Sequence, residues 1–441
     1  MVPEGFAEVP AAAFGGPGAG ACIGPEPGRG RRAANRLGPV HGSVMISVED
    51  YRARVVSLPA ARTLAVQRVG LAEACGRVLV DELTARFPVP PFDNSAMDGF
   101  AVRAADVADA PVRLVVAGES AASGGDIASV RPGAAVRVMT GGRLPPGADA
   151  VVPVESTDQP AGAVPLPSHV RILEAVEPGR HVRRAAEDLA AGDLVLAAGT
   201  PLTPAAISAA ASVGYGELSV RTRPRVAVIA TGAELVEPGR ALAEGEIPDS
   251  NSVMVAALAA QAGADVVAVA RSGDDPRALA DLLAGLPAVD VVFTTGGVSA
   301  GAYEPVRQLG AGLEFCAVAM QPGKPQGCGL VDGVPVLAFP GNPVSSFVSF
   351  HVFGRPLLDA LTGARRPKAR RFAAALDAWP SPAGRRQYVP VITETEGVRL
   401  SHALGSGSHL IASLHLADAL AVVPEERRSV AVGDVLDVMA V

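Results

Sequence analysis

The sequence predicts a multidomain protein of the α/β plus β class, and two patterns support this prediction. Between residues 223 and 366, apolar strands alternate with helices, which is typical of a parallel sheet with helices on both faces. On either side of this stretch, short alternating segments are separated by Gly and Pro turns, as in β-rich units. A chain of 441 residues holds roughly three domains.

The composition argues against several classes of protein. Hydrophobic residues make up 49% of the chain and aromatic residues only 4%, so we expect cores built from Ala, Val and Leu. A formal net charge of -7 offers no basic surface for nucleic acid. The cysteines lack a CxxC spacing and the histidines form no cluster, which argues against a zinc site or a disulfide framework. No apolar run reaches the ~18 residues of a membrane span and no signal-peptide pattern is found, so we expect a cytoplasmic protein.

The first part of the chain predicts a tail followed by helices. Residues 1–44 are rich in Gly, Pro and Ala, and we expect a disordered tail. A helix is expected over 47–56, with Ser47 as N-cap and an acid three residues later. A second helix is expected over 69–80. The Pro-rich stretch 87–92 blocks helix and central strand alike, so the chain passes between modules there.

A β-rich unit is expected from about 112 to 181, where turns separate short strands. Just before it, the string Asp-Asn-Ser-Ala-Met-Asp-Gly at 93–99 predicts a tight loop that contains Asp98. Taken alone, this loop is typical of an Asx-rich turn. A strand over 136–138 then runs into a glycine turn that carries Thr140.

The stretch after the β-rich unit begins with charge. Residues 183–188, which include Asp188, are by themselves typical of a solvated face. An Ala-rich helix over 204–213 and a strand over 217–220 are expected to follow.

From residue 223 the pattern is that of an open α/β sheet. Helices are expected over 252–262, after the Asp274-Asp275-Pro276 start signal, and in a long apolar run that ends at Leu361. Buried strands are expected over 226–230, 265–270, 289–293 and 334–339.

Polar and glycine-rich loops follow the predicted strands of this sheet. Ligands of such sheets lie beyond the carboxyl ends of the strands, where these loops meet. The loops contain Glu234, Asp274 with Asp275, Gly296 to Ser299, Lys324, and the Pro-Gly-Asn-Pro turn at 340–343. We therefore expect a pocket at this edge.

The residue types in these loops suit chemistry at a phosphate. Backbone N–H groups of Gly296 and Gly297, with the charge of Lys324, favour an anion. Carboxylates favour Mg²⁺, a hard cation that takes oxygen ligands. The acids concerned are Glu234, Asp274, Asp275 and Glu304. The alternative is that these acids only stabilise helix N-termini.

The last part of the chain, 367–441, predicts a small β-barrel or sandwich. Strands are expected near 371–376, 387–392 and 430–438.

Several motifs together resemble the molybdopterin molybdenumtransferase family, the MoeA type related to the E domain of gephyrin. They occur in the family's order and cover essentially all of 45–441. They are Asp-Asn-Ser-Ala-Met-Asp-Gly at 93–99, Met-Thr-Gly at 139–141, Glu187-Asp188, Thr-Gly-Ala-Glu-Leu at 231–235, Asp274-Asp275-Pro276, Gly-Gly-Val-Ser at 296–299, Pro-Gly-Lys-Pro at 322–325 and Pro-Gly-Asn-Pro at 340–343.

The resemblance implies four domains. Domain I is split between 45–84 and 184–222, and the β-rich domain II spans 85–183. Domain III, 223–366, is a parallel-sheet molybdopterin-binding domain of the MogA/MoaB-like kind, and domain IV is the C-terminal β-barrel.

The resemblance also implies a reaction. Such enzymes work in molybdenum cofactor biosynthesis. They take adenylylated molybdopterin and molybdate, cleave the adenylate with Mg²⁺ and release AMP. A homodimer is implied, with other proteins of the pathway as further partners and with neither nucleic acid nor membrane bound.

The family's functional positions map onto numbered residues of this chain. Asp98, Thr140, Asp188 and Glu234 would be catalytic, with the first three on the domain II side of a cleft between two subunits. Glu234, Asp274 and Glu304 would hold the metal ion. The substrate-binding positions would be Asp274, Gly296, Gly297, Ser299, Glu304, Lys324, Pro340, Asn342 and Pro343.

The chain departs from the family pattern at four places. Ala233 and Glu304 stand where the family has other acids, and Ala317 and Gln321 where it often has lysine. Two readings therefore compete with the transferase: a molybdopterin-binding scaffold with weakened turnover, and a relative that only adenylylates the pterin. The triad of Asp98, Thr140 and Asp188 favours the transferase, since an adenylylating domain alone needs no β-rich insert.

Overall fold

The computed structural model describes residues 45–120, 127–162, 164–298, 305–309, 312–367, 370–405 and 407–441. The predicted tail, 1–44, lies outside the described residues. None of the helices in these ranges combines the length and hydropathy needed to cross a membrane.

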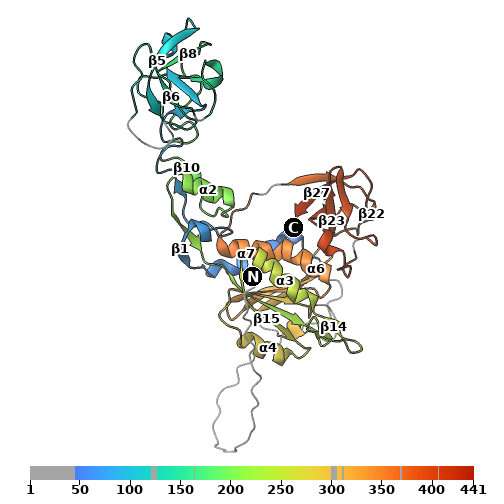
Figure 1. The fold of residues 1–441 in the computed structure, drawn as a ribbon. Helices are drawn as coiled ribbons and strands as arrows, with labels where there is room; N and C mark the ends of the chain where they lie inside the picture. The colour runs from blue at the N-terminus through green and yellow to red at the C-terminus, as the bar shows by residue number, and fades with distance from the viewer. Residues whose placement is uncertain are drawn as a thin grey trace, which may run out of the picture. The chain divides into compact units, whose positions relative to one another are not determined.

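A six-stranded sheet forms the core of the α/β unit (Figure 1), and its strand order is β15-β12-β16-β20-β19-β17. The first four strands run parallel, whereas β19 and β17 run antiparallel to their neighbours. The strands are β12 (Arg225–Thr231), β15 (Asp265–Ser272), β16 (Val291–Thr295), β17 (Leu313–Ala317), β19 (Pro325–Val331) and β20 (Val334–Phe339).

The sheet is therefore mixed, and not wholly parallel as predicted. The cause is a two-residue hairpin between β19 and β20, where Val331 pairs with Val334. Asp332 and Gly333 both have positive φ, 49° and 76°, and an Asp-Gly pair in this conformation is a strong hairpin signal. The hairpin keeps the start of β19, next to Lys324, at the same edge as the carboxyl ends of the parallel strands.

Helices cover both faces of the sheet, as predicted. On one face, Val226 and Val228 pack with α1, α3, α6 and α7, while on the other Ala227 and Ile229 pack with α4 and α5. Figure 1 shows α3 and α4 on opposite sides of β15. The helices are α1 (Val48–Ser57), α3 (Ser250–Gln261), α4 (Pro276–Ala284), α5 (Pro305–Gln308), α6 (Pro343–Ser349) and α7 (Arg355–Thr362), with a π-helical turn over Phe350–Gly354 between the last two.

The first helix confirms the predicted start at Ser47, whose hydroxyl accepts a hydrogen bond from the Asp50 N–H at 3.0 Å. Its buried residues Val48, Tyr51 and Val55 pack into the α/β core. The ring of Tyr51 meets that of Phe353 edge-on, with centroids 4.7 Å apart. The helix thus packs in the α/β core, although the resemblance placed its residues in the first part of domain I.

A smaller unit is built from two distant stretches of chain. β1 (Val66–Gly70) pairs antiparallel with β11 (Glu217–Arg221), and β2 (Leu83–Thr84) pairs with β10 (Leu194–Leu196). With α2 (Pro204–Ser212) these strands enclose one apolar core. The predicted helix over 69–80 is wrong, because pairing with β11 holds 66–70 in a strand and only a 3₁₀ turn, Leu71–Glu73, follows.

The β-rich unit is a five-stranded sheet of order β7-β4-β6-β5-β8 around Phe100, Leu114, Val152 and Ile172. A two-stranded ribbon of β3 and β9 lies beside the tight loop that contains Asp98. The strands are β3 (Asn94–Ser95), β4 (Gly99–Val102), β5 (Val112–Ser120), β6 (Ala134–Val138), β7 (Ala150–Pro153), β8 (His169–Ile172) and β9 (Val182–Arg183), with 3₁₀ turns at Ala104–Asp106 and Val154–Ser156.

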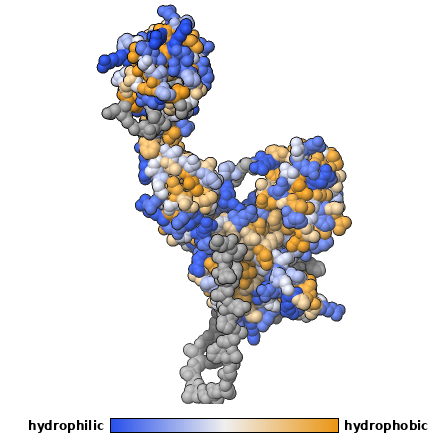
Figure 2. Space-filling model, in the orientation of Figure 1, coloured by the Kyte–Doolittle hydropathy of each residue, from blue (hydrophilic) through white to orange (hydrophobic). Residues whose placement is uncertain are grey.

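The C-terminal unit is a closed β-barrel, as predicted. β24, β23, β25, β27 and β21 follow one another, and a bridge from Ala375 to Val398 closes the ring. Hydrophobic and hydrophilic residues are interspersed on the face in Figure 2. The strands are β21 (Arg371–Ala374), β22 (Trp379–Pro380), β23 (Arg386–Glu394), β24 (Gly397–Leu400), β25 (Ala419–Val423), β26 (Ser429–Val430) and β27 (Val435–Ala440), with a 3₁₀ turn at Leu414–Leu416.

Two short ribbons complete the fold. β18 (Met320–Gln321) pairs with β23 and ties the α/β unit to the barrel. β13 (Leu235–Val236) pairs with β14 (Ile247–Pro248) in the loop after Glu234. The second ribbon forms one wall of the site.

Candidate active site

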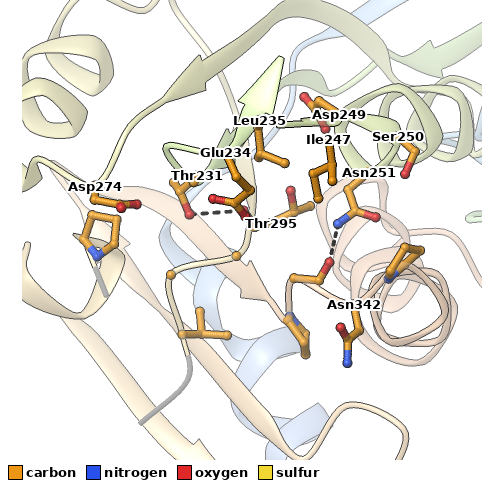
Figure 3. A pocket seen from close by; sticks show the side chains of 18 of the residues that line it. Thr231, Glu234, Leu235, Ile247, Asp249, Ser250, Asn251, Asp274, Thr295 and Asn342 are labelled. Carbon is orange, nitrogen blue, oxygen red and sulfur yellow. Dashed lines mark hydrogen bonds between the residues drawn. The ribbon is translucent and has the colours of Figure 1, made fainter. Parts of the chain in front are cut away.

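A cavity of about 660 Å³ lies at the edge where β12, β16 and β20 end (Figure 3). Its position is the one predicted from the loop sequences. Seven of the predicted site residues line it: Glu234, Asp274, Gly296, Gly297, Pro340, Asn342 and Pro343. Gly341, in the same turn as the last three, lines it as well.

Glycines let two loops of this cavity approach each other. Gly296 and Gly297 have φ of 85° and 65°, and a Cβ at Gly296 would lie 2.5 Å from the carbonyl oxygen of Thr231. Gly341 in the facing turn lies against Gly296. The N–H of Gly296 donates to the Phe339 carbonyl at 3.0 Å, and the expected role of this loop in anion binding stays a prediction.

The acids of this edge have different environments. Glu234 and Asp274 are exposed side chains that line the cavity. The Glu234 carboxylate folds back over Gly232, where an added Cβ would meet it at 2.6 Å. Asp275, in contrast, accepts a hydrogen bond from the Arg277 N–H at 2.9 Å and caps α4. For Asp275 the helix-cap alternative is therefore correct.

Polar atoms without partners face this site. Asn251 donates through Nδ2 to the Gly341 carbonyl at 2.6 Å, while its buried Oδ1 has no partner among the described residues. The Thr295 hydroxyl is in the same situation, beside the Thr231 hydroxyl that donates to the Thr295 carbonyl at 3.2 Å. Buried polar atoms of this kind need a hydrogen-bond partner, and a bound ligand supplies one.

The Asp-Ser-Asn cluster at 249–251 contributes both to a helix cap and to the cavity. Asp249 does cap α3, accepting from the Ser252 N–H at 3.0 Å. Asn251, two residues later, instead faces the cavity (Figure 3). An asparagine in the first turn of a helix that begins at the ligand-binding edge of the sheet is the sequence signal that could have identified Asn251.

The barrel also contributes to the site. Asn342 donates through Nδ2 to the Ser408 hydroxyl at 2.8 Å, and the Val344 N–H donates to the Ser408 carbonyl at 3.1 Å. These bonds hold His409 of the barrel against the cavity that it lines. Nothing in the spacing of the sequence pairs residues 342 and 408, so His409 was missed.

Lys324 lies close to this edge but does not line the cavity. Its side chain is exposed, and its carbonyl accepts from the Val318 N–H at 2.8 Å. Nearby, Gln321 accepts a hydrogen bond from Nη1 of Arg385 at 3.2 Å. The guanidinium of Arg385 therefore lies beside position 321, where this chain has glutamine and the family often has lysine.

Ser299 and Glu304 lie outside the described residues. Within the described part of the chain, no three His, Cys, Asp or Glu side chains are grouped as a metal ion requires. The predicted metal set of Glu234, Asp274 and Glu304 therefore stays a prediction.

A second cavity, of about 620 Å³, lies on the β-rich unit and contains Asp98. Oδ1 of Asp98 accepts from the Thr140 N–H at 2.6 Å and from its hydroxyl at 2.8 Å. These two donors, the backbone N–H first, hold the pKa of Asp98 below its usual range. The turn itself is capped by Ser95, which bonds both the N–H and the carbonyl of Met97. The loop is thus a turn capped by Ser95, while the side chain of Asp98 bonds Thr140.

Asp188 lies on a separate exposed loop, where its N–H donates to the Val89 carbonyl at 3.0 Å. It lines neither cavity. The structure thus joins Asp98 and Thr140 by hydrogen bonds but does not join Asp188 to them.

Comparison with known protein families accounts for most of the chain. Residues 46–214 match the MoeA N-terminal region (domain I and II), 227–360 match the probable molybdopterin binding domain, and 373–441 match the MoeA C-terminal region (domain IV). Molybdopterin molybdenumtransferase 2 of Mycobacterium tuberculosis is 43% identical over 411 residues, which are 89% of this chain and 99% of that relative. This chain belongs to the molybdopterin molybdenumtransferase family. It is a transferase of molybdenum cofactor biosynthesis.

Other members of the molybdopterin molybdenumtransferase family are more distant in sequence. The enzyme of Haemophilus influenzae is 31% identical over 379 residues, covering 84% of this chain and 92% of that one. The molybdopterin biosynthesis MoeA protein of Pyrococcus horikoshii superposes with a TM-score of 0.73 at 27% identity, over 90% of this chain and 100% of that one. The fold is therefore that of the family along nearly the whole chain.

Proposed function

We propose that this transferase inserts molybdenum from molybdate into adenylylated molybdopterin, with Mg²⁺ and with release of AMP. The observation that carries the proposal is the main cavity, where Glu234 and Asp274 lie with the unpartnered Asn251 Oδ1. A cavity of about 660 Å³ is within the usual range for small-molecule sites.

The polar atoms of this cavity suit a pterin with an attached adenylate. Asn251 Oδ1 is a fixed acceptor for a ring N–H, and the Thr295 hydroxyl both donates and accepts. Pro340 and Pro343 supply apolar surface against which a flat ring packs. Where Gly341 approaches Gly296, the wall of the cavity that would face the ligand is backbone without side chains.

The donor set of this cavity fits Mg²⁺. The carboxylates of Glu234 and Asp274, both exposed in this cavity, are hard oxygen ligands. When bound, the cation neutralises charge at the phosphoanhydride. The carboxylates otherwise repel a phosphate, so they support the proposal only with a cation between them and the ligand.

Positive charge for molybdate and phosphate comes from the rim. None of the described residues that line the cavity is a lysine or an arginine. Arg271 and Arg277 flank Asp274 in the chain, and Lys324 directly precedes Pro325, which lines the cavity.

Asp98 and Thr140 lie in a cavity on another unit of the same chain. In this proposal they meet the main cavity of a second subunit in a homodimer. The carboxylate of Asp98, kept ionised by Thr140, orients molybdate or the metal-bound end of the substrate there.

The test is AMP release by the purified protein from adenylylated molybdopterin, molybdate and Mg²⁺. Wild type should release AMP, and omission of Mg²⁺ should abolish release. Binding of the pterin without any AMP release would instead identify a scaffold of the same fold.

A mixing experiment tests the shared site. Homodimers of Asp98→Ala and of Glu234→Ala should each be nearly inactive. After subunit exchange, heterodimers carry one doubly altered site and one intact site, so activity should partly return. A mixture that stays inactive despite demonstrated exchange would rule out a site shared between subunits.

A further inference from the structure

A third cavity, of about 590 Å³, lies at the opposite edge of the α/β sheet. It is formed where the chain leaves β11 and enters β12, so Arg225 at the start of β12 lines it, while Thr231 at the other end lines the main cavity. At about 3.3 Å per residue, β12 separates the two cavities by roughly 20 Å. The described residues that line it are Thr63, Leu64, Ala65, Gln67, Arg77, Thr222, Arg223, Arg225, Asp265 and Asp290.

Three arginines converge on this cavity. Arg77 is only 8% exposed, yet within the described part of the chain it forms no ion pair and its Nε has no hydrogen-bond partner. Its Nη2 donates to the Arg221 carbonyl at 2.7 Å, and the Gln67 amide, oriented with oxygen inward, accepts from both terminal nitrogens. These neutral acceptors do not compensate the charge, and a buried charge without a counter-ion is costly.

A second guanidinium adds to this imbalance. Burial, and then the charge of Arg223, lower the pKa of Arg77, while the carboxylates of Asp265 and Glu73 raise it to a smaller extent. The only ion pair of Arg223 among the described residues is a long one, 3.9 Å to Asp265. Arg225 forms none, because Asp290 instead accepts from its backbone N–H at 2.8 Å. Among the residues that line the cavity, three arginines face two carboxylates, and Glu73 outside the lining is a further carboxylate near Arg77.

We propose that this cavity binds the phosphate or diphosphate group of a small molecule, at a site separate from the transferase site. Guanidinium groups around one cavity favour a polyvalent oxyanion. Arg223 and Arg225 are free of short ion pairs among the described residues, and the Nε of Arg77 has no acceptor there. The cavity volume exceeds that of a bare phosphate and suits a phosphorylated small molecule. The bound anion would join the β1–β11 unit, through Arg77, to the sheet, through Arg223.

Inorganic pyrophosphate is the probe for this site, titrated calorimetrically into the full-length protein. Arg223→Gln should weaken binding on the order of tenfold, the loss expected for a charge-assisted hydrogen bond. Asp265→Asn should strengthen it, because the substitution releases Arg223 from its carboxylate. Arg68→Gln is the matched control: Arg68 is exposed on β1, pairs with Glu217 at 3.2 Å and does not line the cavity.

The paired substitutions keep the test independent of folding and of transferase activity. Arg77→Gln should also weaken binding, but its burial makes folding a concern, whereas Arg223 is on the rim. Equal pyrophosphate affinity in wild type, Arg223→Gln and Asp265→Asn would overturn the proposal. A second outcome would also overturn it: wild type does not bind pyrophosphate, but Arg223→Gln changes the oligomeric state measured by sedimentation. That result would mean that the cavity binds an acidic segment of a second copy of the chain.

Discussion

For single residues of this protein, the hydrogen bonds seen in the fold indicate a function that the spacing of motifs in the sequence does not reveal. Asp98 was singled out by its motif, but the motif does not reveal which group it bonds. The two hydrogen bonds from Thr140 make it an acceptor with both donors on one oxygen, so Oδ2 is left for a ligand. Asp188 was predicted to be catalytic together with Asp98, but no hydrogen bond joins the two in the described part of the chain.

Thr140→Val should shift the acid limb of the activity profile. The substitution removes the hydroxyl donor and keeps the backbone donor, so the pKa of Asp98 should rise toward its ordinary value. Because the ionised carboxylate is the active form, activity should be lost at a higher pH than in wild type. The pH dependence of AMP release measures this, and an acid limb that does not move would show that Asp98 does not act as a carboxylate.

Asn251→Ala should weaken pterin binding more than it weakens folding. The substitution removes the acceptor at the cavity and one hydrogen bond to Gly341, so we expect roughly a tenfold loss of affinity. Val253→Ala is the control, since Val253 lies in the same helix, is 56% exposed and does not line the cavity. Equal ligand affinity in the two variants would remove Asn251 from the site.

At the scale of elements, the glycine turns that end the strands shape the site. Gly296→Ala forces a side chain into positive φ and against the Thr231 carbonyl, which should cost about 1–3 kcal/mol of unfolding free energy. Gly341→Ala has no such strain, and its Cβ would lie 3.6 Å from Gly296. Urea unfolding should therefore give different free energies of unfolding for the two variants. Gly341→Ala should be as stable as wild type but should bind the ligand less tightly. Similar stabilities would mean that the loop relaxes freely.

The elements that could be predicted were those with local signals. α4 was identified from its acidic N-cap and following proline, and α1 from Ser47. The helix predicted over 69–80 failed because β11, well over a hundred residues away, supplies the strand partner. The antiparallel hairpin was missed although Asp332-Gly333 is a local signal for it. His409 and the Arg385 contact depend on tertiary packing alone, which a single sequence does not display.

At the scale of the whole molecule, removal of 1–44 should leave function intact. The family match begins at residue 46, and the side chain of Ser47 caps α1. The truncated protein should have the thermal midpoint of the full chain in scanning calorimetry and the same rate of AMP release. A drop of several degrees would show that the segment contributes to the folded core.

The position of α1 in the α/β core has a consequence for synthesis. Arg52 donates to the Val352 carbonyl at 3.0 Å across 300 residues of chain. At the usual speed of translation, about 5–20 residues per second, the partner surface is made roughly 15–60 s after the helix. Residues of β12 and α3 in the same core are made earlier, but α6 and α7 are still missing throughout that interval. The ribosome-bound chain therefore carries a helix whose apolar face, Val48, Tyr51 and Val55, is only partly covered, and we expect a chaperone to engage it there.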